Sequence, residues 1–276
     1  MAALRRKQAP MNQHIMSAAG VPTEGRPGIR LEAVTLRRGE RTVFEHLTLD
    51  LRQSRIGLIG DNGAGKSSLF RLICGLEQPQ AGRVSVHGRD TANAADRRVL
   101  PQQVGLMFQN PDDQIIFPTV GEELAFSLTA AGVGKAPARQ QAQTFLAERG
   151  RADWAERAIG ELSQGQRQQV CLMALQITRP ATLLLDEPYS SLDLLSQQRL
   201  SAQIAATSQQ IILSTHLLDH VHDFERVLWL DNGTVRGDGP GHEVCAAYAQ
   251  DVRERALAEA GAGRQAPLQT GAASHA

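Results

Sequence analysis

Three glycines, one cation and a hydroxyl stand in the spacing G-x-x-x-x-G-K-S in one segment, Gly60-Asp61-Asn62-Gly63-Ala64-Gly65-Lys66-Ser67. Glycines of this kind let the backbone curl so that its N–H groups face a phosphate, and a helix that starts there adds its positive dipole end. Lys66 would offer its charge to the β- and γ-phosphates, and the Ser67 hydroxyl would ligate magnesium. The sequence predicts a strand over residues 55–59 and a helix over residues 68–74. A phosphate loop requires this context, with a strand before it and a helix after it. A glycine-rich turn that binds nothing is the alternative, and this context disfavours it.

Two acids follow a second apolar segment. Thr182 to Leu185 is strand-like, and Asp186 and Glu187 come directly after it. A buried strand that ends beside the phosphate loop would place Asp186 near the magnesium ion and Glu187 near the attacking water. The alternative is that both acids are simply solvated at the end of a strand. The phosphate loop upstream makes this alternative the weaker of the two.

Ser163 and Gln166 have the S-x-x-Q spacing of a capping box at the start of a helix. A helix start that carries a hydroxyl, Gly165 and free N–H groups can also bind an anion. Taken alone, the pattern predicts only a helix cap.

The elements that must position these residues can be read from periodicity. Leu47, Leu49 and Leu51 alternate with polar residues, as in a half-buried strand. Asn232-Gly233 predicts a hairpin turn between strands at 226–230 and 234–237. Further strands are expected at 30–36, 41–51, 82–88, 182–185 and 210–214, and helices at 120–131, 136–150, 153–159, 163–177 and 195–206. The alternation of helix and strand from residue 163 onward favours a parallel sheet covered by helices.

Composition excludes several classes of protein. The chain has 276 residues with 29 Lys plus Arg and 29 Asp plus Glu, so it lacks the basic surplus typical of nucleic-acid binders, and no nucleic-acid partner is expected. Its three cysteines match no metal-ligand spacing and indicate reduced thiols. No apolar run approaches the length of a membrane span. We expect a disordered N-terminal extension at 1–28, one domain at 29–245 with a helical insert at about 111–175, and a helix fragment with a disordered tail at 246–276.

In this order, the motifs resemble those of the ATP-binding-cassette family over about residues 29–245. Residues 60–67 match its Walker A motif, Gln109 its Q-loop, residues 162–166 its signature motif, residues 182–187 its Walker B motif, residues 190–193 its D-loop, and His216 its switch histidine. Gln164 stands where glycine is commonest in the signature motif, and Leu217 follows the histidine where an Asp is frequent.

The resemblance implies an α/β fold: a P-loop NTPase core sheet, an antiparallel β subdomain and a helical insert. It implies ATP and Mg²⁺ as ligands and a head-to-tail dimer with a second copy or a paralogous ATPase. Glu187 would be the general base, His216 would contact the γ-phosphate, and Gln109, Ser67 and Asp186 would hold magnesium. The nucleotide would further contact Ser68 in its own chain, Ser163, Gly165 and Gln166 of the partner, and Asp193 of the D-loop. Arg38 stands where an aromatic residue usually stacks on adenine, and its guanidinium can lie flat on a purine.

Among cassette proteins, we expect the ATPase of an importer. A repair-type protein would carry a long coiled coil between Ser67 and Ser163, and a translation-type protein would carry two cassettes in one chain. Residues 108–120 and Glu122-Glu123 resemble the Q-loop region of energy-coupling-factor ATPases, and residues 216–248 resemble the biotin-type subunit. Cobalt or nickel importers and solute-binding-protein-dependent importers are the alternatives. The partners expected are a transmembrane coupling protein and a membrane substrate-binding protein, with the ATPase on the cytoplasmic face of the cell membrane.

An apolar run, Ile115-Ile116-Phe117, follows the Q-loop segment. Exposed apolar residues usually mark an interface, so we expect the surface around residues 109–118 to contact the membrane partner. The alternative is that these side chains only anchor the helical insert to the core.

Overall fold

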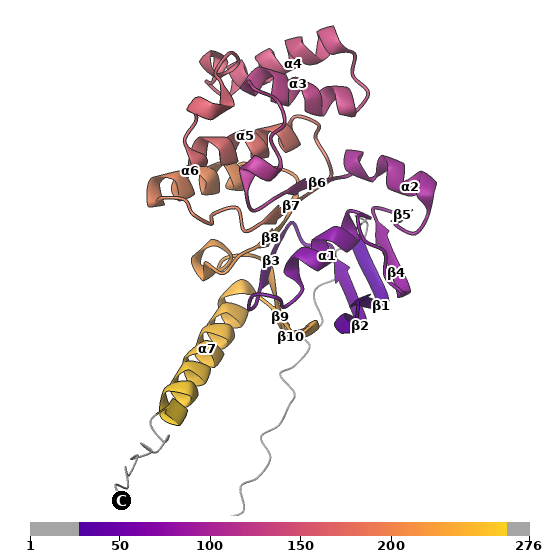
Figure 1. Cartoon of the computed structure of the whole chain (residues 1–276), viewed down its shortest axis with the longest axis vertical. Coiled ribbons are helices and arrows are strands. Elements are labelled where there is room, and N and C mark those ends of the chain that lie inside the picture. The colour runs from indigo at the N-terminus through magenta and orange to yellow at the C-terminus, as the bar shows by residue number, and fades with distance from the viewer. Residues whose placement is uncertain (1–27, 264–276) are drawn as a thin grey trace, which may run out of the picture.

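The computed structural model describes residues 28–263. The extension predicted to be disordered lies, apart from Gly28, outside the described residues, and so does the part of the predicted tail from residue 264 onward. Figure 1 shows the small sheet on one side of the molecule, the helices α3, α4 and α5 at one end, and α7 projecting at the other.

The larger sheet has six strands in the order β10-β9-β3-β8-β7-β6. Its strands are β3 (Arg55–Ile59), β6 (Val104–Met107), β7 (Thr182–Asp186), β8 (Gln210–Ser214), β9 (Arg226–Asp231) and β10 (Thr234–Gly239). All neighbours pair in parallel except β9 and β10, which form the antiparallel hairpin predicted from Asn232-Gly233. Because parallel strands leave the sheet at one edge, the segments after β3, β6, β7 and β8 can meet there.

The smaller sheet is antiparallel, with the order β2-β1-β4-β5. It consists of β1 (Ile29–Arg38), β2 (Arg41–Leu51), β4 (Ala81–Val86) and β5 (Arg89–Asp90). Leu47, Leu49 and Leu51 are buried while the residues between them are exposed, which confirms the predicted alternation in β2.

Helix α1 (Lys66–Ile73) joins the two sheets, because Leu69, Phe70, Leu72 and Ile73 lie in one apolar cluster with strands of both. On the other face of the large sheet, α5 (Gln164–Gln176), α6 (Leu194–Ala205) and α7 (Gly241–Gly263) contribute to a second cluster. A third cluster joins α3 (Val120–Ala130), α4 (Lys135–Glu148) and α5. The short helix α2 (Ala94–Val99) buries no residue, and single-turn 3₁₀ helices at Leu100–Gln102, Pro111–Asp113 and Leu218–His220 complete the connections.

The expectation of a helix over residues 153–159 is wrong. The structure has isolated 3₁₀ turns at Ala152–Trp154 and Ile159–Glu161, with irregular chain between them. The carbonyl groups of Ala155 and Arg157 accept hydrogen bonds from Gly121 and Val120 at the start of α3, so they are not available to a helix of their own. Strand β6, which the sequence analysis did not find, has only four residues and forms the edge of the sheet.

Helix α7 is longer than the helix fragment expected after residue 245. It begins at Gly241 and runs without interruption past that position, and Val244 and Cys245 are buried. In the part of the chain that the structure describes, no helix combines the length and the apolarity that crossing a membrane requires.

The two sheets touch at the β9–β10 turn, and this contact generates a stability prediction. Gly233 has φ +77°, and a Cβ atom there would lie 1.9 Å from the Val43 carbonyl oxygen of β2. We expect Gly233→Ala to lower the free energy of unfolding by about 2–4 kcal/mol, because it adds a backbone clash to left-handed strain. Gly39→Ala is the matched control, since Gly39 has φ +60° with no atom within 4 Å of the added carbon; it should cost about 1 kcal/mol. Urea unfolding of the full chain measures both, and equal losses would contradict the role of the contact.

Candidate functional site

The phosphate loop connects β3 to α1 and follows the backbone path that its glycines predict. Gly60, Gly63 and Gly65 all have positive φ angles, of 139°, 82° and 110°. A Cβ atom on Gly60 would lie 2.1 Å from the Leu230 carbonyl oxygen, and one on Gly65 would lie 2.7 Å from the Phe44 ring. These two positions therefore require glycine for space as well as for conformation.

A pocket of about 640 Å³ lies over this loop at the carboxyl edge of the large sheet. It collects most of the residues that the sequence analysis proposed for the site. The lining comprises Arg38, Arg41, Val43, Gly60, Asp61, Asn62, Gly63, Gly65, Lys66, Ser67, Ser68, Gln109, Asp186, Glu187, His216 and Tyr248. Ala64, also part of the loop, does not line the pocket, because its side chain is buried.

Lys66 is buried at the base of the pocket, with 8% of its surface exposed. Its Nζ donates to the carbonyl oxygens of Gly60 at 2.7 Å and Asp61 at 3.3 Å. The ammonium group is thus held inside the loop by two neutral carbonyl oxygens. A phosphate oxygen, which is charged, can take their place as the acceptor.

Glu187 and His216 are paired across the end of the sheet. Glu187 Oε2 accepts a hydrogen bond from His216 Nδ1 at 2.8 Å and lies 3.3 Å from the backbone nitrogen of His216. Glu187 has a left-handed φ of 47°, and its backbone N–H donates to the Ser214 carbonyl group. Beside it, Asp186 Oδ1 accepts from the Ser214 hydroxyl at 2.6 Å. Strands β7 and β8 thereby fix the direction of both acids.

The segment after β6 carries Gln109 into the pocket and is tied to α5 through side-chain amides. Gln168 Nε2 donates to the Gln109 carbonyl oxygen at 3.0 Å. Gln114 accepts from the backbone N–H of Phe108 and donates to the Cys171 carbonyl oxygen. Asp112 forms an ion pair with Arg167 at 3.1 Å. The Q-loop segment and α5 are therefore connected at several points.

The signature residues lie away from this pocket in their own chain. Ser163 and Gln166 form the predicted capping box: Ser163 Oγ accepts from the Gln166 N–H, and Gln166 Oε1 accepts from the Ser163 N–H. A Cβ atom on Gly165 would lie 2.4 Å from Ser196 Oγ, so α5 and α6 approach closely there. Asp193 caps α6 by accepting from the Ser196 N–H. The structure thus does not bring Ser163, Gly165, Gln166 or Asp193 to the pocket that holds Lys66.

Arg38 lines the pocket as expected, but its guanidinium group is already paired. It donates to both carboxylate oxygens of Glu77, which raises the pKa of Arg38 and lowers the pKa of Glu77. Sequence reasoning missed Arg41, which donates to the Gly63 carbonyl oxygen at 2.9 Å, because no local motif marks it. It also missed Tyr248, whose hydroxyl lies 2.9 Å from Asp61 Oδ1 across 187 positions of sequence.

Comparison with known proteins identifies relatives of this chain. The family model described as ABC transporter matches residues 44–190. The biotin transport ATP-binding protein BioM of Rhodobacter capsulatus is 49% identical over 229 residues, covering 83% of this chain and 96% of that protein. The energy-coupling factor transporter ATP-binding protein EcfA1 of Symbiobacterium thermophilum is 35% identical over 225 residues, covering 79% and 76%. The solved structure of cbiO1 from Clostridium perfringens, part of the complex cbiONQ, superposes with a TM-score of 0.72 at 22% identity, covering 84% and 96%, and shows the same fold.

The Glu187–His216 pair generates a prediction about turnover. We expect Glu187→Gln to bind ATP while its hydrolysis rate falls by about 10²–10⁴, because the amide cannot accept a proton from water. Trapped nucleotide should then favour a dimer, which light scattering detects. Glu45→Gln, on the exposed surface of β2 outside the pocket, is the control and should hydrolyse ATP normally. Near-normal turnover by Glu187→Gln would remove Glu187 from the role of base.

Proposed function

The chain belongs to the ABC transporter ATP-binding family, and from that premise we propose that it energises an importer of energy-coupling-factor type that takes up biotin. The observation that carries the proposal is the convergence of Lys66, Ser67, Asp186, Glu187 and His216 on one pocket at the carboxyl edge of the sheet. These residue types are the ones that γ-phosphate hydrolysis needs. The choice of biotin is supported by the similarity to BioM over 83% of the chain.

In the proposed reaction, Glu187 accepts a proton from a water molecule whose oxygen attacks the γ-phosphorus of ATP. The bond from that phosphorus to the bridging oxygen breaks, and ADP and phosphate are the products. His216 Nδ1 donates to Glu187 Oε2, which keeps the carboxylate oriented, and a proton on Nε2 as well would let that nitrogen donate to a γ-phosphate oxygen. Lys66 exchanges the carbonyl groups of Gly60 and Asp61 for phosphate oxygens as ATP enters.

The pocket also fits a magnesium ion. Magnesium prefers hard oxygen ligands, and Ser67, Asp186 and Gln109 supply a hydroxyl, a carboxylate and an amide oxygen along the lining. Within residues 28–263 the one hydrogen bond to the Asp186 carboxylate reaches Oδ1, so Oδ2 is available to a cation. When bound, the ion would neutralise charge that develops on the β- and γ-phosphates.

A second copy of the chain, or a paralogous ATPase, would complete each site in a head-to-tail dimer. The capping box uses the N–H groups of Ser163 and Gln166, and among the residues described those of Gln164 and Gly165 have no acceptor, so this start of α5 suits an anion that another chain presents. Asp193 and its neighbours would lie at the same interface. The adenine base would rest against Arg38, whose guanidinium plane Glu77 holds at the rim of the pocket.

The proposed membrane partner is a transmembrane coupling protein, with a separate membrane substrate-binding protein, and the ATPase would lie on the cytoplasmic face. The apolar run beyond the Q-loop divides into two kinds of residue. Ile115 packs against two apolar clusters, whereas Ile116 is 71% exposed. Phe117 contacts Phe126 with ring centroids 4.9 Å apart. We propose that Ile116, rather than Ile115, contacts the coupling protein.

Uptake of radiolabelled biotin tests the function. The full chain, expressed with its membrane partners in a bacterial strain that lacks a biotin transporter, should support biotin uptake, and the Glu187→Gln chain should not. Uptake of Co²⁺ or Ni²⁺ without biotin uptake would replace biotin by a metal ion as the substrate. A requirement for a free solute-binding protein would favour the third class of importer.

The division between Ile115 and Ile116 gives a docking prediction. We expect Ile116→Asp to give a folded chain that binds ATP but no longer co-purifies with the coupling protein or drives uptake. Ile115→Asp is the matched control, and it should lower the melting temperature of the isolated chain because it buries a charge. An Ile116→Asp chain that unfolds, or one that still assembles and transports, would contradict the docking claim.

A further inference from the structure

The second residue of the phosphate loop, Asp61, carries a negative charge at a site built for a polyanion. Its carboxylate borders the pocket, and 48% of the side chain is exposed. The positive charge of Lys66 lies near enough to interact electrostatically with the Asp61 carboxylate. An uncompensated carboxylate in this place would repel phosphates and compete with them for Lys66.

The C-terminal helix α7 supplies the compensating charge. Arg255 donates through both terminal nitrogens to Asp61, at 2.6 Å to Oδ2 and 3.3 Å to Oδ1. These bonds are the largest cause of the lowered pKa of Asp61, and the Tyr248 hydroxyl adds a further bond to Oδ1. Asp61 is therefore ionised at neutral pH, and its charge is matched by Arg255.

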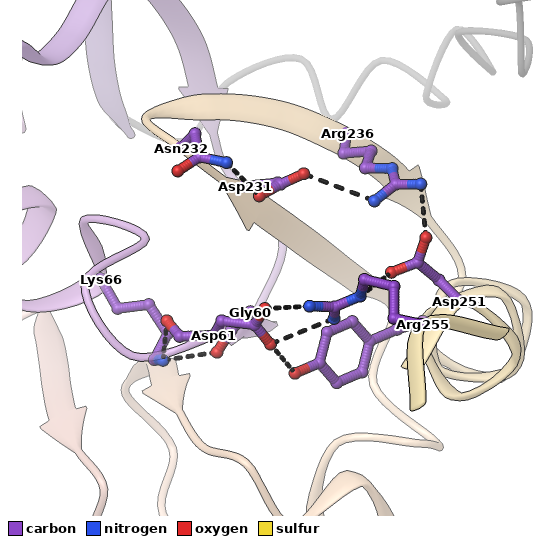
Figure 2. A network of polar contacts seen from close by, with 9 residues as sticks. Gly60, Asp61, Lys66, Asp231, Asn232, Arg236, Asp251 and Arg255 are labelled. Atoms are coloured by element: carbon purple, nitrogen blue, oxygen red, sulfur yellow. Dashed lines mark hydrogen bonds and ion pairs between the residues drawn. The ribbon is translucent and has the colours of Figure 1, made fainter. Parts of the chain in front are cut away.

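Arg255 is itself held by a series of alternating charges, which Figure 2 shows from β9 to the phosphate loop. Arg255 Nε donates to Asp251 at 2.8 Å. Asp251 also accepts from Arg236 of β10, and Arg236 reaches Asp231 at the end of β9 at 3.4 Å. The helix is fixed by packing as well, since the Tyr248 ring meets the Trp229 ring edge-on with centroids 5.3 Å apart.

We propose that Arg255 sets the affinity of this chain for ATP by neutralising Asp61, so that α7 is a functional part of the nucleotide site. Arg255 does not line the pocket and acts through Asp61, as a positioning and charge-compensating residue rather than a catalytic one. The inference rests on the proposed function only in requiring that the pocket bind ATP.

Charge compensation predicts opposite effects at the two ends of the ion pair. Arg255→Gln leaves Asp61 uncompensated, and the affinity for ATP should fall about three- to tenfold. Asp61→Asn removes the repelling charge and leaves Arg255 in place, so the affinity should rise about two- to fivefold. The double variant should return to within about twofold of the unmodified chain. If α7 only held the loop in position, both single variants would break the same contact and both would weaken binding.

The measurements are the dissociation constant for a non-hydrolysable ATP analogue and the KM and kcat for ATP, each on the full chain. In Arg255→Gln, KM for ATP should change more than kcat. Arg255→Lys should restore most of the lost affinity. Raising the salt concentration should reduce the difference in affinity between Arg255→Gln and the unmodified chain. Arg253→Gln is the matched control, because it removes the same charge from the same helix. Among the residues described, Arg253 has no hydrogen-bond or ion-pair partner. Its affinity should not change.

Two results would overturn the inference: an unchanged affinity in Arg255→Gln, or weaker binding in Asp61→Asn. The second arm is independent of whether Arg255→Gln folds, since Asp61→Asn replaces a half-exposed side chain by one of nearly the same size and changes no residue of the helix. Failure of the unmodified chain to bind the analogue would instead overturn the proposed function, so the two failures are distinguishable.

Discussion

The site depends on one steric constraint, the close approach of both sheets to the phosphate loop. The carbonyl group of Leu230 in β9 leaves no room for a side chain at Gly60, and the ring of Phe44 in β2 leaves none at Gly65. The loop is thus held between the large sheet and the small one, with α1 packed against both. Residues of either sheet can reach it for the same reason, as Arg41 does when it binds the Gly63 carbonyl group.

Sequence reasoning identified the parts of the site whose chemistry is local. The glycine spacing, the apolar strand before Asp186 and the Ser163–Gln166 cap each follow from residues that are neighbours in the chain, and the structure contains all three features. Strands β2, β3 and β8 have the predicted bounds, since alternation and β-branched residues mark them without tertiary help.

The features that sequence reasoning missed depend on contacts between segments that are distant in the chain. Residues 153–159 have helical propensity, yet the start of α3 takes their carbonyl groups as acceptors. Asp61 and Arg255 are 194 positions apart, so no pattern in the sequence indicated their ion pair. The pairing of Arg38 with Glu77 across 39 positions likewise has no local signal. Tertiary partners, rather than propensity, decided these features.

The amide contacts between the Q-loop segment and α5 have a mechanical consequence. Gln168 donates a hydrogen bond to the Gln109 carbonyl group, and Gln114 donates one to the Cys171 carbonyl group. Arg167 forms an ion pair with Asp112. A shift of Gln109 must therefore carry the start of α5 along with it or break these bonds, of which the two amide bonds are partly buried. We therefore expect the two segments to move together, since these contacts connect Gln109 with the helix that begins beside Ser163. If Gln109 contacts the γ-phosphate as proposed, loss of that phosphoryl group would displace the surface around Ser163 that another chain would meet.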